Sequence, residues 1–281
     1  MSNLVIGNSS QLGHYFPEDY VCISSRDYDL DSLCSRRWDS VYICFAEQRT
    51  YLAHSQDKAV SELFWRTNLE KTKDTIIRLQ EVADKIVYYS TAELWNNTCG
   101  PVNEGMSFRH HANNYTSSKE AITIELKDKK KYPKVSIVYP FNFNSIHRGD
   151  EYLFGKVFGS IVRNERVTIG DTDYYRELLH PKMVVEGSIA STMPGRDVVL
   201  GSGRLVHVGD FIRNLYSFFG KDYDEYVQNN QGNPSIYRTN IFYSANRCPG
   251  FDEVRLFELT VSELKQAIIG FHHEKANQIS K

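Results

Sequence analysis

Short runs of hydrophobic residues alternate along this chain with polar, turn-forming segments. Their length and continuous apolar character are typical of buried parallel strands. These runs lie at 3–6, 20–23, 38–46, 86–89 and 135–138. Between the third and fourth runs, residues 57–82 place apolar side chains at helical spacing, and a second helix is expected to begin near Asn114. Strands that alternate with helices in this way predict an α/β fold with a doubly wound parallel sheet.

A glycine-containing turn follows the first strand. In a Rossmann-type sheet, the turn between the first strand and its helix forms an anion site for a dinucleotide pyrophosphate. We expect the helix here to be short, because Pro17 and the second strand follow Gly13 closely, which weakens the pull of the helix on phosphate. The residues expected to contact a cofactor in this turn are Gly7, Ser9, Ser10, Gln11, Leu12 and Gly13.

A tyrosine and a lysine lie four residues apart at the start of the helix near Asn114. At this spacing Tyr115 and Lys119 share one helical face. An ammonium group beside a phenol favours the phenolate, so we expect Lys119 to lower the pKa of Tyr115 toward neutrality. The fourth hydrophobic run ends just before Thr91, whose hydroxyl is expected to hold a substrate oxygen next to the phenol. Together these groups predict proton transfer coupled to hydride transfer at one carbon.

The order of these features resembles the extended short-chain dehydrogenase/reductase family of nucleotide-sugar epimerases, dehydratases and 4-keto reductases. The segment 90–95, Ser-Thr-Ala-Glu-Leu-Trp, is similar to that of the 4,6-dehydratases, where the glutamate takes the C5 proton after C4 has been oxidised. The resemblance therefore implies Thr91, Tyr115 and Lys119 as catalytic residues, with Glu93 as the base. The acid that precedes this glutamate in the glucose-type enzymes is Ala92 here, so the proton donor for the departing water is unassigned. Epimerases carry a similar segment.

The resemblance also implies a nicotinamide cofactor. Arg26 follows the second strand, where an arginine suits a 2′-phosphate, so NADP(H) is favoured over NAD(H); the alternative is that Arg26 only opens a solvated loop. Asp29 and Leu30 resemble the adenine-side segment of the family. The expected contacts nearer the nicotinamide are Phe45, Ala46, Tyr115, Lys119 and Pro140.

Residues after 140 resemble the substrate loop of the GDP-mannose 4,6-dehydratases. The resemblance implies that Asn142, Asn144 and Arg148 contact the nucleotide sugar, and that Arg176 contacts its diphosphate. It also implies a division into two parts. Residues 1–140, with a return segment near 177–190, form the Rossmann domain, whereas 141–176 and 191–281 form a smaller C-terminal α/β substrate lobe.

Composition narrows the class of partners. A net charge of −2 and a pI near 6.5 over 281 residues argue against a nucleic-acid partner. Hydrophobic runs are too short to span a membrane, and the amino terminus lacks a leader pattern, which predicts a cytoplasmic protein. Five cysteines, an odd number, are expected to be core thiols, and neither they nor the nine histidines have metal-ligand spacing. A homodimer is implied by the family resemblance alone.

The preferred hypothesis is 4,6-dehydration of a GDP-linked hexose through oxidation at C4. One alternative is an NADPH-dependent 4-keto reductase or a C4/C5 epimerase from the same family. Another is a non-catalytic relative that binds sugar nucleotides, since Ser10, Ala92 and Tyr139 depart from the family pattern.

Overall fold

Six parallel strands form the central sheet of the computed structural model, which describes residues 2–230 and 235–279. In space they are ordered β2-β1-β3-β4-β6-β11, and every neighbouring pair is parallel. The predicted Rossmann-type α/β architecture is confirmed. The strands are β1 (Asn3–Ile6), β2 (Val21–Ile23), β3 (Trp38–Ile43), β4 (Ala83–Tyr89), β6 (Val135–Pro140) and β11 (Val198–Leu200).

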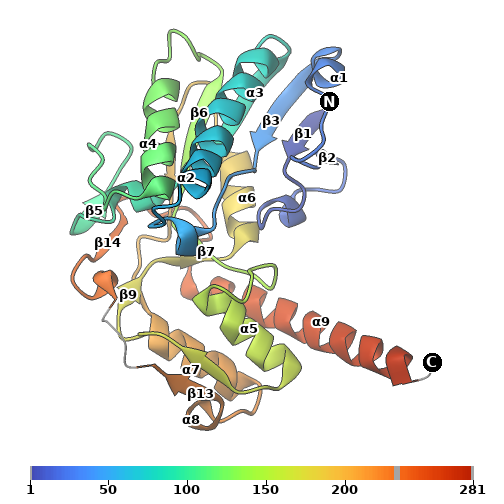
Figure 1. The fold of residues 1–281 in the computed structure, drawn as a ribbon, viewed down its shortest axis with the longest axis vertical. Coiled ribbons are helices and arrows are strands. Elements are labelled where there is room, and N and C mark those ends of the chain that lie inside the picture. Colours follow the sequence, from blue (N-terminus) through green and yellow to red (C-terminus); the bar gives the residue numbers. More distant parts are fainter. Residues whose placement is uncertain (1, 231–234, 280–281) are drawn as a thin grey trace.

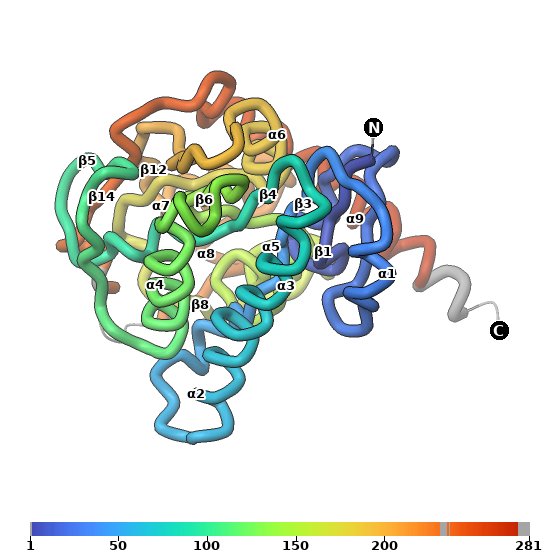
Figure 2. Tube along the Cα trace, turned by 90° about the horizontal axis from the view of Figure 1, so that it is seen from above, coloured from blue at the N-terminus to red at the C-terminus, as the bar shows by residue number. Residues whose placement is uncertain are grey.

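Helices cover both faces of this sheet. Figure 2, seen from above, shows α3 and α4 on one side of the strands and α6 on the other. The predicted helix over 57–82 is present, but a six-residue π-helix interrupts it. Asn68 lies within this π-helix and is 1% exposed. The elements on these faces are α2 (Lys58–Trp65), the π segment η3 (Arg66–Lys71), α3 (Thr72–Leu79), α4 (Asn114–Leu126) and α6 (Pro181–Ser191).

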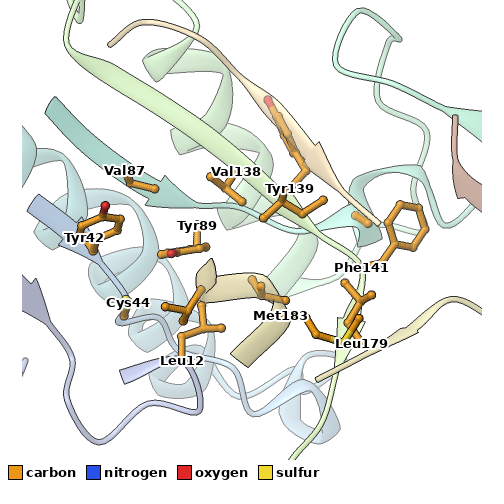
Figure 3. Close-up of a cluster of buried hydrophobic side chains, with 14 of the residues drawn as sticks. Leu12, Tyr42, Cys44, Val87, Tyr89, Val138, Tyr139, Phe141, Leu179 and Met183 are labelled. Atoms are coloured by element: carbon orange, nitrogen blue, oxygen red, sulfur yellow. The ribbon is translucent and has the colours of Figure 1, made fainter. Parts of the chain in front are cut away.

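The first crossover of the sheet has no α-helix, as the position of Pro17 predicted. Only a single 3₁₀ turn, η1 (Gly13–Tyr15), follows the glycine turn. Aromatic packing takes the place of the missing helix: Phe16 and Tyr20 lie against Tyr42 of β3, with ring centroids 4.9 and 5.9 Å away. Figure 3 shows Leu12, Tyr42, Cys44 and Tyr89 in the same buried cluster. The strand order is therefore preserved by side-chain packing where the usual helix is absent.

The remaining chain builds a smaller lobe beneath the sheet, seen in the lower half of Figure 1. It contains four helices and several two-stranded pairs of strands in the part of the chain that the structure describes. The lobe and its connections comprise β7 (Asn142–Phe143), α5 (Leu153–Arg163), β8 (Val167–Ile169), β9 (Tyr175–Arg176), β10 (Leu178–Leu179), β12 (Val206–His207), α7 (Val208–Phe218), α8 (Tyr223–Tyr226), β13 (Val227–Asn229) and α9 (Glu253–Ile279). Short elements elsewhere are α1 (Leu30–Cys34), η2 (Thr50–Leu52), η4 (Ala92–Trp95), β5 (Gly100–Val102), η5 (Ile236–Arg238) and β14 (Phe242–Ser244).

Two sequence expectations need correction. Residues 198–200 belong to the range 191–281 that is expected in the substrate lobe, but they form β11, which pairs with β6 as the edge strand of the main sheet, with Val198 opposite Val138. Cys22 was expected in the core, but it lies on the edge strand β2, where one side of the strand faces solvent, and it is exposed. Cys99 is exposed as well, whereas Cys44 and Cys248 are buried. Within the described residues, no helix is long and apolar enough to cross a membrane.

Candidate active site

A cavity of about 580 Å³ opens at the carboxyl ends of β4 and β6. In open α/β sheets this edge is where ligands bind, because the loops that leave parallel strands converge there. The cavity brings together residues from both halves of the chain. Those expected from the sequence that line it are Leu12, Phe45, Ala46, Thr91, Glu93, Tyr115, Lys119, Pro140, Asn142, Asn144, Arg148 and Arg176.

Helix capping positions the predicted acid/base pair. Thr91 follows β4 and caps η4, accepting a hydrogen bond from the Glu93 backbone N–H at 3.1 Å. Asn113 caps α4 through a reciprocal pair of bonds with Thr116, which starts the helix one residue before Tyr115. The Tyr115 phenol lies near enough to the Thr91 side chain for Thr91 to lower the pKa of the phenol, and both residues line the cavity.

The electrostatics of this pair differ from the prediction. Burial raises the pKa of Tyr115 to about 12, although the Thr91 side chain and the charge of Arg148 act to lower it. Lys119 turns away: its ammonium donates to the Tyr89 carbonyl at 2.7 Å and to the Tyr88 hydroxyl at 3.2 Å. The expectation that Lys119 lowers the Tyr115 pKa is therefore wrong in this structure. Desolvation instead lowers the pKa of Lys119 to about 7.

Three side chains surround the carboxylate of Glu93. The Arg176 guanidinium forms an ion pair with its Oε1. Its Oε2 accepts hydrogen bonds from the Tyr237 hydroxyl at 2.9 Å and from the Asn96 amide at 3.1 Å. Arg176 comes from β9 of the lobe and Tyr237 from η5, so two segments distant in sequence reach Glu93, which lies in η4 directly after β4. Arg176 is thus bound to Glu93 in this structure. Nothing in the sequence indicated that Tyr237 and Asn96 would bind the same carboxylate.

The second arginine of the cavity carries a charge with no acidic partner among the described residues. The Arg148 guanidinium lies over the Tyr152 ring, 3.7 Å from its centroid, and its Nε is buried without a hydrogen-bond partner there. A buried N–H donor without an acceptor is costly, so an anionic ligand group would be stabilised beside this half-buried guanidinium. Asn142 and Asn144 line the same cavity on the loop that follows Pro140.

The glycine turn fits a dinucleotide only in part. Gly7 adopts φ +111°, and a Cβ there would lie 3.0 Å from the backbone of Cys44 and Phe45. A Cβ on Gly13 would lie 2.3 Å from the Gly7 carbonyl, so the turn is closed tightly. Ser10 stands at the middle glycine of the family pattern, and its hydroxyl accepts from the Gly13 N–H at 3.1 Å. The turn therefore has the tightly packed backbone that a dinucleotide site requires, but a 3₁₀ turn follows it instead of a long helix.

Residues expected at the adenine end lie outside the cavity. Arg26 is exposed, and the side chain of Asp29 caps α1 by accepting from the Asp31 N–H, with Leu30 as the first residue of that helix. Ser9 is exposed on the turn, whereas Gln11 is half-buried with its Oε1 unpartnered among the described residues. Sequence reasoning missed Lys71, whose ammonium donates to the Ser25 carbonyl at 2.6 Å beside Arg26.

Asn68 does not line the cavity, but it holds the loop after β3, where Ala46 and Gln48 line it. Its side chain accepts from the Glu47 N–H at 2.7 Å and donates to the Glu47 carbonyl and to the Ser118 hydroxyl. These bonds tie the loop after β3 to α4, next to the residues that carry the phenol and the ammonium. In the part of the chain that the structure describes, no group of three or more His, Cys, Asp or Glu side chains could hold a metal ion.

The fold is similar to those of several solved structures. RMD from Pseudomonas aeruginosa complexed with NADPH is 16% identical, with a TM-score of 0.72 over 96% of this chain and 99% of that chain. The dTDP-glucose 4,6-dehydratase of Bacillus anthracis in complex with NAD is 14% identical, with a TM-score of 0.73 over 95% and 97%. The UDP-glucuronic acid 4-epimerase of Bacillus cereus in complex with UDP-glucuronic acid and NAD is 17% identical, with a TM-score of 0.74 over 95% and 99%.

The chain therefore has the fold of the nucleotide-sugar dehydratases and epimerases, as the sequence resemblance predicted. The likeness extends over nearly the whole of both chains, including the lobe beneath the sheet. Neither protein-family models nor curated proteins give a match.

Proposed function

We propose that this protein is an NAD(P)-dependent enzyme of the extended short-chain dehydrogenase/reductase family that acts on C4 of a nucleotide-activated sugar. The observation that carries this proposal is the meeting of the Tyr115 phenol and the Thr91 hydroxyl inside a cavity at the carboxyl edge of the sheet. In this role, Tyr115 takes or returns the C4 hydroxyl proton while Thr91 holds the same oxygen. A bound nicotinamide would accept or supply the C4 hydride.

The cavity also offers polar groups that would bind the diphosphate of a nucleotide sugar. Arg148 offers a half-buried cation to the diphosphate, and Asn142 and Asn144 offer amides to the polar groups around it. The cofactor would lie along Gly7 to Gly13 and reach Phe45, Ala46 and Pro140. Exposed Arg26, with Lys71 close to the same loop, supports NADP(H) over NAD(H).

The finer proposal is 4,6-dehydration of a GDP-linked hexose, with Glu93 as the base that withdraws the C5 proton. It requires that the Glu93 carboxylate be freed from its ion pair with Arg176 when the substrate enters. The substrate diphosphate would take over this ion pair while the guanidinium keeps its place over the Tyr237 ring. The alternative is a 4-keto reductase or an epimerase, in which Glu93 would remain paired.

Mass spectrometry of the product separates these reactions. Purified protein is incubated with GDP-mannose and NADP⁺ or NAD⁺, and we expect a product lighter by one water. A product of unchanged mass identifies an epimerase, and turnover that needs added NADPH and a 4-keto substrate identifies a reductase. Absence of any thermal shift with either dinucleotide would instead support a non-catalytic binding protein.

We also propose the division into a cofactor domain, 1–140 with 177–190, and a substrate lobe, now with β11 moved to the cofactor domain. A homodimer through the outer faces of α3 and α4 is supported by exposed Ile77 and Ile124 on these helices. Sedimentation of the purified protein tests the dimer.

A further inference from the structure

Loss of water across C5 and C6 of a sugar requires two protein groups. A base must take the C5 proton, and an acid must protonate the C6 hydroxyl as it departs. Glu93 is in place for the first task, but Ala92, the residue directly before it, ends in a methyl group that carries no transferable proton. The acid must therefore come from elsewhere around Glu93, because the two tasks are performed on adjacent carbons.

Chemistry reduces the candidates that contact Glu93 to one. Its three side-chain partners among the described residues are Asn96, Arg176 and Tyr237. A carboxamide gives up no proton at ordinary pH, and an arginine guanidinium is not deprotonated in proteins. A phenol can lose a proton and regain it, so Tyr237 is the partner able to act as an acid.

The structure fixes Tyr237 in a position suited to this role. Its hydroxyl donates to Glu93 Oε2 at 2.9 Å, and its ring lies 3.6 Å from the Arg176 guanidinium carbon. The residue that follows, Arg238, forms two hydrogen bonds to the carboxylate of Asp171 at 2.7 and 2.6 Å, which anchors the segment to the lobe. Tyr237 also lines the cavity that holds Tyr115 and Thr91.

We propose that Tyr237 is the acid that protonates the departing hydroxyl, a role that rests on the dehydratase activity proposed above. Glu93 removes the C5 proton, the C5–H electron pair forms the C5–C6 double bond, and the C6–O bond breaks. The hydroxyl leaves as water with the Tyr237 proton. The C4 hydride would return from a bound reduced nicotinamide to C6 while Glu93 returns its proton to C5, which consumes the C5–C6 double bond. The phenolate of Tyr237 then regains a proton equivalent to the one that Tyr115 took from the C4 hydroxyl, so protons and electrons balance.

The surroundings of Tyr237 match both halves of this cycle. Burial raises its pKa and keeps the phenol protonated before reaction, while the charge of Arg176 lowers the pKa and would stabilise the phenolate that forms. The cation over the ring is therefore part of the arrangement, since a phenolate formed without it would stand beside the carboxylate of Glu93.

Tyr237→Phe tests the role, because it removes the proton but keeps the ring over which Arg176 lies. The variant and the wild type are incubated with the nucleotide sugar and oxidised dinucleotide in D₂O. We expect Tyr237→Phe to oxidise C4, seen as absorbance of the reduced dinucleotide, and to exchange the C5 hydrogen for deuterium, while water loss falls by about 100-fold or more. Glu93→Gln should lose the C5 exchange as well. Tyr175→Phe is the matched control, since it removes an exposed phenol next to Arg176.

The outcomes separate this role from a structural one and from failure of the proposed function. Loss of C4 oxidation, C5 exchange and water loss together in Tyr237→Phe would mean that Tyr237 only orients Glu93, and the acid role would be wrong. Dehydration within about threefold of the wild type would also overturn it. If the wild type neither reduces the dinucleotide nor forms a lighter product, the proposed function fails, and the role of Tyr237 fails with it.

Discussion

The ammonium of Lys119 donates a hydrogen bond to the backbone carbonyl of Tyr89 at 2.7 Å, which ties helix α4 to the end of strand β4. The lysine is 2% exposed, and no carboxylate is paired with it among the described residues, since its ammonium bonds to the Tyr88 hydroxyl and the Tyr89 carbonyl. Its charge is therefore balanced only by the dipoles of a carbonyl and a phenol, which explains why burial lowers its pKa to about 7.

Replacing Lys119 by Met should change how stability depends on pH. The folded-state pKa near 7 lies below the unfolded value near 10.5, so between these values the unfolded chain binds more protons, and the stability of the wild type rises with pH. We expect the stability of Lys119→Met relative to the wild type to be most favourable below pH 7 and to decline steadily toward pH 10. Urea unfolding across this range measures it. Lys134→Met is the control, since Lys134 also donates to a backbone carbonyl but is only half-buried; an equal pH trend there would contradict the prediction.

The raised pKa of Tyr115 gives the oxidation step a definite pH dependence. With a pKa of about 12, the phenolate fraction rises about tenfold per pH unit throughout the neutral range. The rate of C4 oxidation should therefore increase with pH up to at least pH 10. Tyr115→Phe should lower this rate by about 10²- to 10⁴-fold without loss of dinucleotide binding. Stopped-flow absorbance of the reduced dinucleotide provides the measurement, and a flat profile would show that chemistry does not limit the step or that the phenol is already ionised.

Arg148 should control substrate affinity. Because its guanidinium has no acidic partner among the described residues, Arg148→Met removes a ligand contact without leaving a protein carboxylate unpaired. We expect GDP-sugar to bind about 10- to 100-fold more weakly, as titration calorimetry would measure, with the thermal stability unchanged or raised. Arg148→Lys should restore only part of the affinity, since an ammonium group lacks the planar fork. Arg163→Met serves as the control, because that arginine forms surface ion pairs with Asp150 and Glu165.

Arg26 and Lys71 should decide between the two dinucleotides. Both cations lie at the loop that follows β2, where a 2′-phosphate would reach. Arg26→Ala is expected to weaken NADP⁺ binding about tenfold and to leave NAD⁺ binding nearly unchanged, because only NADP⁺ carries the additional phosphate. Fluorescence titration with each dinucleotide measures this ratio. If binding of NADP⁺ and NAD⁺ weakened equally, Arg26 would contact a group that the two dinucleotides share. If neither binding weakened, Arg26 would be a solvated loop residue without a role in binding.

A buried carboxyl in the lobe predicts a second pH effect on stability. Burial raises the pKa of Glu177 to about 7, although the backbone N–H groups of Gly203 and Ser244 donate to it. The folded pKa lies above the unfolded value near 4.5, so the native state binds more protons between these values, and stability falls as pH rises from 4.5 to 7. Glu177→Gln should flatten this part of the profile. Thermal melting between pH 4.5 and 8 tests it; an unaltered slope would be the contrary result.

The sequence by itself determined the frame of the fold. Continuous apolar strands such as 86–89 can only be buried on both faces, which requires helices on either side, and Pro17 leaves no room for a first helix. The same local logic placed Thr91 after its strand and Tyr115 in the first turn of its helix. These features depend on neighbours a few residues away, so the pattern of the chain was sufficient to predict them.

The tertiary structure decided the charges and the partners of the site. Lys119 and Tyr115 share a helical face, yet the lysine bonds to β4, because the carbonyl of Tyr89 ends up within its reach only after the sheet has formed. Glu93 meets Tyr237 across 144 positions of sequence, and Val198 joins the main sheet rather than the lobe. Burial and long-range pairing determine the pKa values and the ion pairs. The spacing of these residues along the chain predicts neither their burial nor their distant partners.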